Sequence, residues 1–136
     1  MKILVFGAGV LGCNLARNFL RAGKDVTLLA RGKWAEEIQK NGLRIKDKFS
    51  PRVSVSRIPV VTELKPEDKY DVIFVVMRYT QIDAIKDTLH ANGTKNIVFV
   101  GNNVSAAADD AFSLSCHKEP VPFKGENAEK DNVVRR

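Results

Sequence analysis

Three glycines near the start of the chain are the residues whose type and spacing point most directly to chemistry. Residues 2–12 read Lys-Ile-Leu-Val-Phe-Gly-Ala-Gly-Val-Leu-Gly, an apolar run that ends in Gly-x-Gly-x-x-Gly. Between a strand and a helix, Gly7 permits a tight turn, Gly9 lets a pyrophosphate approach the backbone, and Gly12 lets the helix pack on the strand. The free N–H groups and positive dipole end of that helix attract an anion. The motif therefore predicts dinucleotide binding, against the alternative of a purely structural glycine turn.

The end of the next predicted strand distinguishes between the two nicotinamide dinucleotides. Sites selective for NAD place Asp or Glu about 20 residues past the glycines, where the carboxylate binds the ribose 2′-OH. This chain instead has Ala30-Arg31-Gly32-Lys33 at that point. Arg31 can bind a 2′-phosphate through two hydrogen bonds, and Lys33 adds a point charge. We therefore predict NADP rather than NAD. The alternative is that both cations are ordinary solvated loop residues.

The spacing of apolar residues indicates which elements position these groups. Apolar runs predict strands at residues 2–6, 25–29, 71–76 and 96–100, with shorter candidates at 43–45, 53–55 and 59–61 whose order stays open. Helical spacing predicts helices at residues 10–22, at 33–41 and after Thr80 as N-cap, the last with Ile82, Ile85 and Leu89 on its buried face. This alternation predicts an α/β fold: a doubly wound, mostly parallel sheet with helices on both faces.

The predicted topology places the candidate site at one edge of the sheet. In doubly wound sheets, ligands bind beyond the carboxyl ends of the strands, where the strand order reverses. The residues that follow the three strongest strands are 7–12, 77–81 and 101–104. We therefore expect these three segments to surround one ligand.

Length and composition limit the remaining possibilities. The 136 residues suit a single domain, expected over residues 1–112, and the segment 113–136 is expected to be a polar, poorly ordered tail. No apolar run is long enough to span a membrane, and the immediate strand after Met1 leaves no room for a signal peptide, so we expect a cytoplasmic protein. The cysteines and histidines have no metal-ligand spacing, which predicts free thiols and no metal.

The net charge of +6 allows two interpretations. A basic protein can bind nucleic acid, or it can bind a small phosphate-rich ligand while its other cations are solvated. The charges are spread along the chain, and no basic stripe interleaved with aromatic residues is present. We therefore expect a small anion as the ligand and no nucleic acid or membrane partner.

Three segments together resemble the N-terminal domain of ketopantoate reductase and its relatives. The first is Gly-Ala-Gly-Val-Leu-Gly followed by Leu-Leu-Ala-Arg-Gly-Lys and, after a helix, Asn-Gly-Leu-Arg-Ile at residues 41–45. The second is Asp-Val-Ile-Phe-Val-Val-Met-Arg-Tyr-Thr-Gln at residues 71–81, and the third is Val-Phe-Val-Gly-Asn-Asn at residues 98–103. The resemblance covers residues 1 to about 105 and implies a Rossmann-like domain.

The resemblance also implies an activity and residue roles. Family members transfer hydride from NADPH to ketopantoate on the path to pantothenate, and relatives reduce other 2-keto acids. Arg31 matches the residue that contacts the 2′-phosphate, and Asn102 matches the asparagine that bridges nicotinamide ribose and substrate. Arg78 stands where the family often has a lysine, Gln81 matches the glutamine after it, and Asn103 replaces a glycine. The predicted cofactor-binding residues are Gly7, Ala8, Gly9, Val10, Leu11, Gly12, Arg31, Lys33, Met77, Arg78, Gln81 and Asn102, with Asn102 also a catalytic positioning residue.

The family places its catalytic lysine and a substrate-binding glutamate on a second, helical domain, and we expect this chain to stop before that domain. Within the matched region Asn102 is a poor acid, and Tyr79 is expected to pack at a helix start. One hypothesis is therefore an oxidoreductase cofactor domain that is incomplete alone; the others are a non-catalytic NADP-binding sensor or regulatory module, and a domain with an idle site. A homodimer or a separate helical domain would cover the open faces of the sheet.

Overall fold

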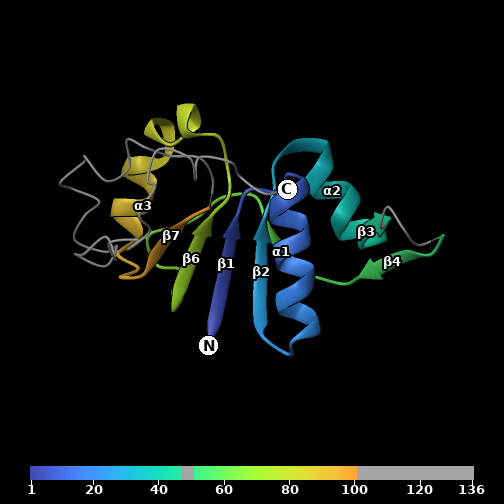
Figure 1. Ribbon diagram of the computed structural model, residues 1–136. Coiled ribbons are helices and arrows are strands. Elements are labelled where there is room, and N and C mark those ends of the chain that lie inside the picture. The colour runs from blue at the N-terminus through green and yellow to red at the C-terminus, as the bar shows by residue number, and fades with distance from the viewer. Residues whose placement is uncertain (47–50, 101–136) are drawn as a thin grey trace, which may run out of the picture.

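The computed structural model describes residues 1–46 and 51–100 and contains a five-stranded sheet in the order β5–β2–β1–β6–β7 (Figure 1). Every neighbouring pair of strands in this sheet is parallel. The strand bounds are β1 Lys2–Phe6, β2 Asp25–Leu29, β5 Val60–Val61, β6 Val72–Val75 and β7 Ile97–Phe99. The chain moves outward from β1 through β2 to β5 and then crosses back to β6, so the strand order reverses between β1 and β6. The predicted doubly wound, parallel sheet is confirmed.

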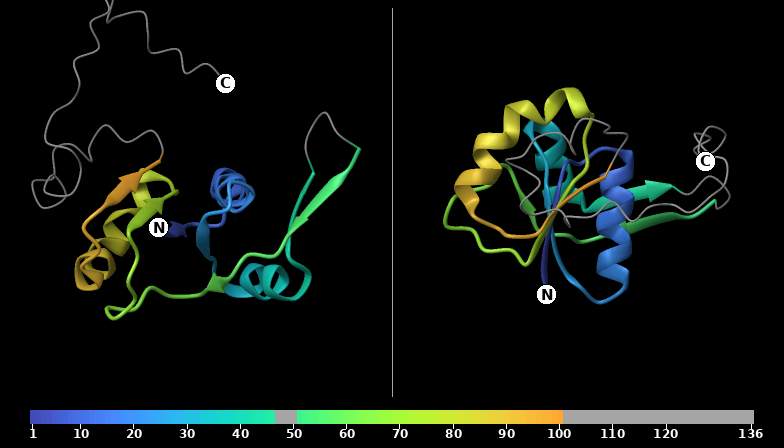
Figure 2. Two further views of the ribbon diagram at one scale, coloured as in Figure 1. Left: turned by 90° about the horizontal axis from the view of Figure 1, so that it is seen from below. Right: turned by 60° about the vertical axis from the view of Figure 1, so that its left-hand side comes forward.

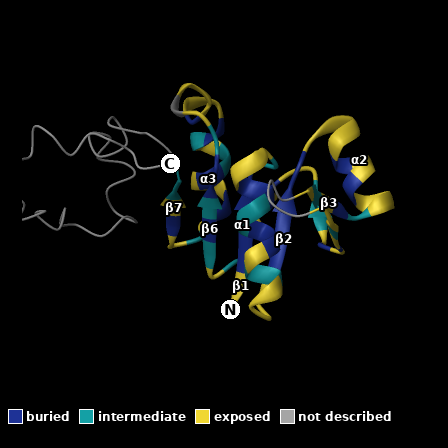
Figure 3. Ribbon diagram, turned by 45° about the vertical axis from the view of Figure 1, so that its right-hand side comes forward, coloured by how far each residue is buried: buried dark blue, intermediate teal, exposed yellow. Residues whose placement is uncertain are grey.

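The central strand β1 is buried on both faces, because its alternate side chains enter two separate apolar clusters. Ile3 and Val5 face the cluster to which helices α1 (Val10–Arg21) and α2 (Gly32–Asn41) contribute. Leu4 and Phe6 face the second cluster, to which α3 (Lys86–Asn92) contributes. Helices therefore cover both faces of the sheet, as predicted, and the buried strands lie between exposed outer helix surfaces (Figure 3).

Helix α1 packs across the sheet, and a glycine follows its C-cap, Ala22. The Phe19 ring packs in a tilted arrangement against Phe74 of β6, with ring centroids 5.0 Å apart. Gly23 has a φ of 70° and donates its N–H to the Leu20 carbonyl, while the Lys24 N–H bonds to the Phe19 carbonyl. These bonds satisfy carbonyls at the helix end and turn the chain directly into β2. The predicted helices at 10–22 and 33–41 are confirmed to within one residue at each end.

The segment after β6 differs from the single helix that the sequence predicted. Two 3₁₀ turns, Tyr79–Gln81 and Asp83–Ile85, precede α3, so Thr80 lies inside a turn and the prediction that it caps the helix is wrong. Ile82, Ile85 and Leu89 are nevertheless buried, as expected. Apolar residues spaced by three or four fit a 3₁₀ turn as well as an α-helix, and that ambiguity is the physical reason for the error.

The strands whose order the sequence left open form a separate hairpin and one edge strand. Strand β3 (Leu43–Lys46) pairs antiparallel with β4 (Val53–Ser56), outside the main sheet. Figure 2 shows this hairpin extending away from the sheet. The Arg17 guanidinium of α1 donates a hydrogen bond to Ser54 Oγ at 3.2 Å, which ties the hairpin to the helix. Strand β5 instead pairs with β2 at the sheet edge.

Several predictions concern residues outside the described ranges. They are the domain boundary at 112, the tail 113–136, Asn102, Asn103 and Cys116. Among the helices of residues 1–46 and 51–100, none is long and apolar enough to cross a membrane.

Candidate functional site

A cleft of about 590 Å³ lies beyond the carboxyl ends of β1, β2 and β6, where the strand order reverses. This is the position at which doubly wound sheets bind their ligands. Backbone bonds hold its walls together: the Gly7 N–H donates to the Leu29 carbonyl and the Val76 N–H to the Phe6 carbonyl. The cleft is lined by Phe6, Gly7, Ala8, Gly9, Leu29, Ala30, Arg31, Trp34, Val76, Met77, Arg78, Thr80, Gln81, Ala84 and Ile85.

The first and third motif glycines are required by packing. Gly7 has a φ of 118°, and a Cβ there would overlap the Val76 carbonyl oxygen. A Cβ on Gly12 would overlap the Gly7 carbonyl oxygen and touch Val5. The start of α1 therefore lies against the end of β1 more closely than any side chain allows.

The second motif glycine faces open space. Gly9 has a φ of −76°, which any residue can adopt, and a Cβ built on it meets no atom of the described residues within 4 Å other than those of its two chain neighbours. Packing within the described part of the chain therefore gives no reason for glycine at this position. A ligand that approaches the backbone closely would supply one.

The N-terminus of α1 adjoins this open space. The first i→i−4 hydrogen bond of the helix joins the Cys13 N–H to the Gly9 carbonyl at 2.9 Å. The N–H groups of Val10, Leu11 and Gly12 therefore have no acceptor within the helix. No acidic side chain lies in the first turn, and no side chain caps the helix. These features favour an anion at this helix end.

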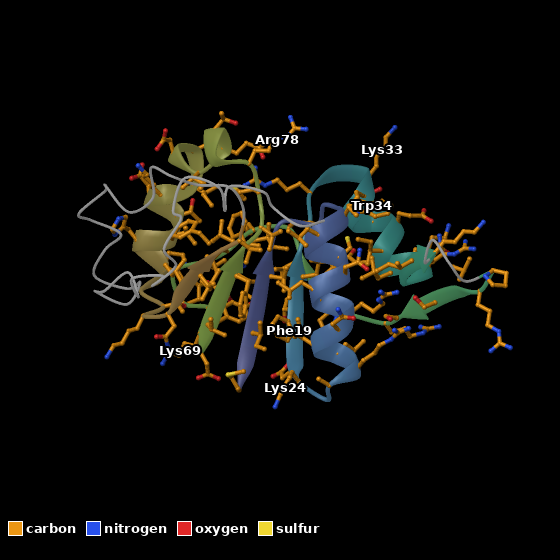
Figure 4. The ribbon with its side chains drawn as sticks, in the orientation of Figure 1. Phe19, Lys24, Lys33, Trp34, Lys69 and Arg78 are labelled. Carbon is orange, nitrogen blue, oxygen red and sulfur yellow. The ribbon has the colours of Figure 1, made fainter. Side chains whose placement is uncertain are left out.

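Cations border the cleft at the ends of the neighbouring strands. Arg31 follows β2 as the N-cap of α2, and its Cζ lies 6.0 Å from the centroid of the Phe6 ring. Figure 4 shows the Lys33 and Arg78 side chains extending outward at this same end of the sheet. Among the described residues that line the cleft, only Arg31 and Arg78 carry a charge, and both are positive. The cleft is therefore suited to an anionic ligand.

A tryptophan connects the segment after β2 with the glycine loop after β1. The Trp34 indole N–H, in the first turn of α2, donates to the Ala8 carbonyl at 3.0 Å. The Cys13 thiol, from beneath the loop, donates to the same oxygen at 3.4 Å. Burial raises the pKa of Cys13, and a hydrogen bond with Trp34 partly offsets that rise. The thiol therefore stays protonated and available as a donor at neutral pH.

The structure brings many of the predicted site residues around one cleft and leaves others beside it. Seven line the cleft: Gly7, Ala8, Gly9, Arg31, Met77, Arg78 and Gln81. Gly12 is buried beneath the loop, while Val10, Leu11 and Lys33 are exposed next to the cleft. Sequence reasoning missed Trp34 as a site residue. Its position one helical turn after Arg31 was the only signal that could have pointed to it. The roles of all these residues stay predictions.

A parallel sheet in this strand order, with a glycine-rich turn at its switch point, defines a Rossmann-like α/β domain. Residues 3–114 match the family model for ketopantoate reductase PanE/ApbA. Because this match covers most of the chain, the protein belongs to the ketopantoate reductase family, and the expected resemblance is confirmed.

Individual relatives agree with this assignment and are longer than the chain. The 2-dehydropantoate 2-reductase of Pyrococcus horikoshii is 31% identical over 98 residues, which are 72% of this chain and 30% of that protein. The PanE/ApbA family ketopantoate reductase of Ralstonia eutropha superposes with a TM-score of 0.69 at 22% identity, over 82% of this chain and 37% of its own. D-mandelate dehydrogenase with NADH superposes with a TM-score of 0.63 at 21% identity, over 74% of this chain and 33% of its own. The two structures show the shared fold, and the chain spans about a third of each relative's length.

Proposed function

We propose that this chain binds NADPH in the cleft beyond β1, β2 and β6, as the cofactor domain of a 2-dehydropantoate 2-reductase-like oxidoreductase. The observation that carries the proposal is the open space at Gly9, beside the N–H groups of α1 that have no acceptor within the helix, in a cleft that Arg31 and Arg78 also line. A pyrophosphate is the part of the ligand that fits this place, because it is anionic and accepts several hydrogen bonds.

The choice of NADPH rests on the charges after β2. Arg31 follows Ala30 at the strand end. The described cleft residues include no carboxylate that could accept hydrogen bonds from the ribose hydroxyls of NAD. Arg31 can bind a 2′-phosphate through two parallel N–H groups, and Lys33 lies two residues further along the same turn. The positive end of α2, which has no acidic residue in its first turn, adds to this attraction.

NADPH, when bound, supplies the hydride for reduction of a 2-keto acid. The residues of this chain would bind and orient it: the glycine loop would hold the pyrophosphate, and Met77 and Ile85 would provide apolar lining. The reaction also needs a proton donor at the substrate oxygen. The described cleft residues include no Lys, His, Asp or Glu. We therefore propose that the proton donor comes from outside the described residues that line the cleft.

The lack of Lys, His, Asp and Glu among the described cleft residues also favours a second candidate function, a non-catalytic NADP-binding module. Both candidates require NADPH binding, and they differ in turnover. The test is calorimetric titration with NADPH, followed by an assay of NADPH consumption with ketopantoate and other 2-keto acids. The assay is run on the chain alone and with the helical domain of a relative added. Turnover in either arm supports the oxidoreductase, and binding without any turnover supports the module. Absence of NADPH binding refutes both.

A further inference from the structure

The Ala8 carbonyl lies in a loop where an oxygen that faced a bound anion would weaken binding. It lies between Gly7 and Gly9, in the loop where we propose that the pyrophosphate binds. A carbonyl oxygen that faced the phosphates would repel them, because both carry negative charge. In this structure the oxygen is instead bound by two donors, the Trp34 indole at 3.0 Å and the Cys13 thiol at 3.4 Å.

The orientation of this carbonyl also fixes the next N–H group. No cis peptide bond occurs in the described residues, so the Gly9 N–H points opposite to the Ala8 carbonyl. A carbonyl held by Trp34 and Cys13 therefore directs the Gly9 N–H away from both donors. Gly9 is the N-cap of α1, so this one peptide plane sets how the loop enters the helix.

We propose that Trp34 is a positioning residue for the glycine loop, which holds the Ala8–Gly9 peptide in the orientation that accepts a pyrophosphate. The inference rests on the proposed function. The hydrogen bond from Trp34 to Ala8 joins residues 26 positions apart, and it links the segment after β2, which carries Arg31, to the loop after β1. Trp34 is half exposed and lines the cleft, so an alternative role is to stack on the adenine ring.

Two substitutions separate the hydrogen bond from the aromatic face. Trp34→Phe removes the N–H and keeps an aromatic ring. Trp34→His restores an N–H, because Nε2 of histidine is as many bonds from Cβ as Nε1 of tryptophan. Gln39→Ala is the matched control, since the Gln39 amide also donates from exposed α2 to a backbone carbonyl, that of Val60 at 3.3 Å, away from the cleft.

The experiment is calorimetric titration of each variant, at a pH of about 8 where histidine is neutral, with two ligands. NADPH contains the pyrophosphate, and adenosine 2′-monophosphate lacks it while keeping adenine and the 2′-phosphate. We expect Trp34→Phe to weaken NADPH binding about fivefold, as for loss of one hydrogen bond. Binding of adenosine 2′-monophosphate should be unchanged. Trp34→His should recover wild-type NADPH affinity, and Gln39→Ala should change neither ligand.

Other outcomes overturn the inference in recognisable ways. Equal weakening of both ligands by Trp34→Phe and Trp34→His would assign Trp34 to the adenine. Unchanged NADPH binding in Trp34→Phe would show that the indole bond has no role, while the proposed function would stand. A wild-type chain that failed to bind NADPH would refute the proposed function and this inference together.

Discussion

Replacement of Gly9 by alanine separates ligand binding from folding more cleanly than any other change in the loop. The φ of −76° suits alanine, and apart from the two chain neighbours no atom of the described residues lies within 4 Å of the added methyl, so the substitution introduces no strain among them. Alanine restricts the unfolded chain, which stabilises the fold, but it is a poorer N-cap than glycine. These two effects oppose each other, and we expect the free energy of unfolding to change by less than about 1 kcal/mol.

The effect of Gly9→Ala on binding should be much larger. A phosphate oxygen that accepts a hydrogen bond from this loop lies about 2.9 Å from a backbone nitrogen. The methyl group would occupy the space through which that oxygen approaches, so one charge-assisted hydrogen bond would be lost. Such a bond contributes about 1.5–3 kcal/mol, which predicts NADPH binding weakened by about ten- to a hundredfold.

Thermal unfolding and calorimetric titration of the same preparation test this pair of expectations. Gly9→Ala should melt near the wild-type temperature and bind NADPH poorly. If Gly9→Ala bound NADPH as tightly as the wild type, the pyrophosphate would not lie against this loop. A large fall in the melting temperature would instead show that Gly9 has a packing role that the structure does not reveal.

Three further predictions concern neighbouring groups. Gly12→Ala should destabilise the fold by on the order of 3 kcal/mol in denaturant unfolding, because its Cβ would overlap the Gly7 carbonyl oxygen; wild-type stability would contradict the packing described here. Burial raises the pKa of the Cys13 thiol in the folded state. The neutral thiol therefore contributes to the stability of the fold at any pH below the pKa of the unfolded state, and this contribution is lost as the pH rises through the pKa of the folded state. Above a pH of about 8.5, the free energy of unfolding should therefore fall faster with pH for wild type than for Cys13→Ala, by at most about 1.4 kcal/mol per pH unit. Parallel curves for the two proteins would contradict this contribution of Cys13. Arg78→Ala should weaken NADPH binding by about threefold or less and reduce its salt dependence, since the side chain is exposed; titrations at low and high salt measure both.

The sheet could be predicted from the sequence because local patterns determine it. The apolar runs of β1 and β2 and the three glycines lie within the first 29 residues, and each signal acts between neighbours in the chain. The location of the cleft then followed from topology, because parallel strands end at one edge. The helices α1 and α2 were equally visible through their spacing.

Contacts between distant segments could not be predicted in the same way. The hydrogen bond from Trp34 to Ala8 joins residues 26 positions apart, and no periodic pattern in the sequence predicts it. The hairpin of β3 and β4 depends on antiparallel pairing, whereas the same alternation of apolar and polar residues also suits a strand of the main sheet. The 3₁₀ turns before α3 share their apolar spacing with a helix, so only the hydrogen bonds distinguish them.

The selectivity between NADPH and NADH tests the central claim most directly. Wild type, Arg31→Ala and the control Arg44→Ala, which removes an exposed cation of β3 away from the cleft, are titrated with both dinucleotides. We predict that wild type prefers NADPH and that Arg31→Ala lowers NADPH affinity by about ten- to a hundredfold with NADH affinity unchanged. Arg44→Ala should behave as wild type. A wild-type chain that binds NADH as tightly as NADPH would contradict the account.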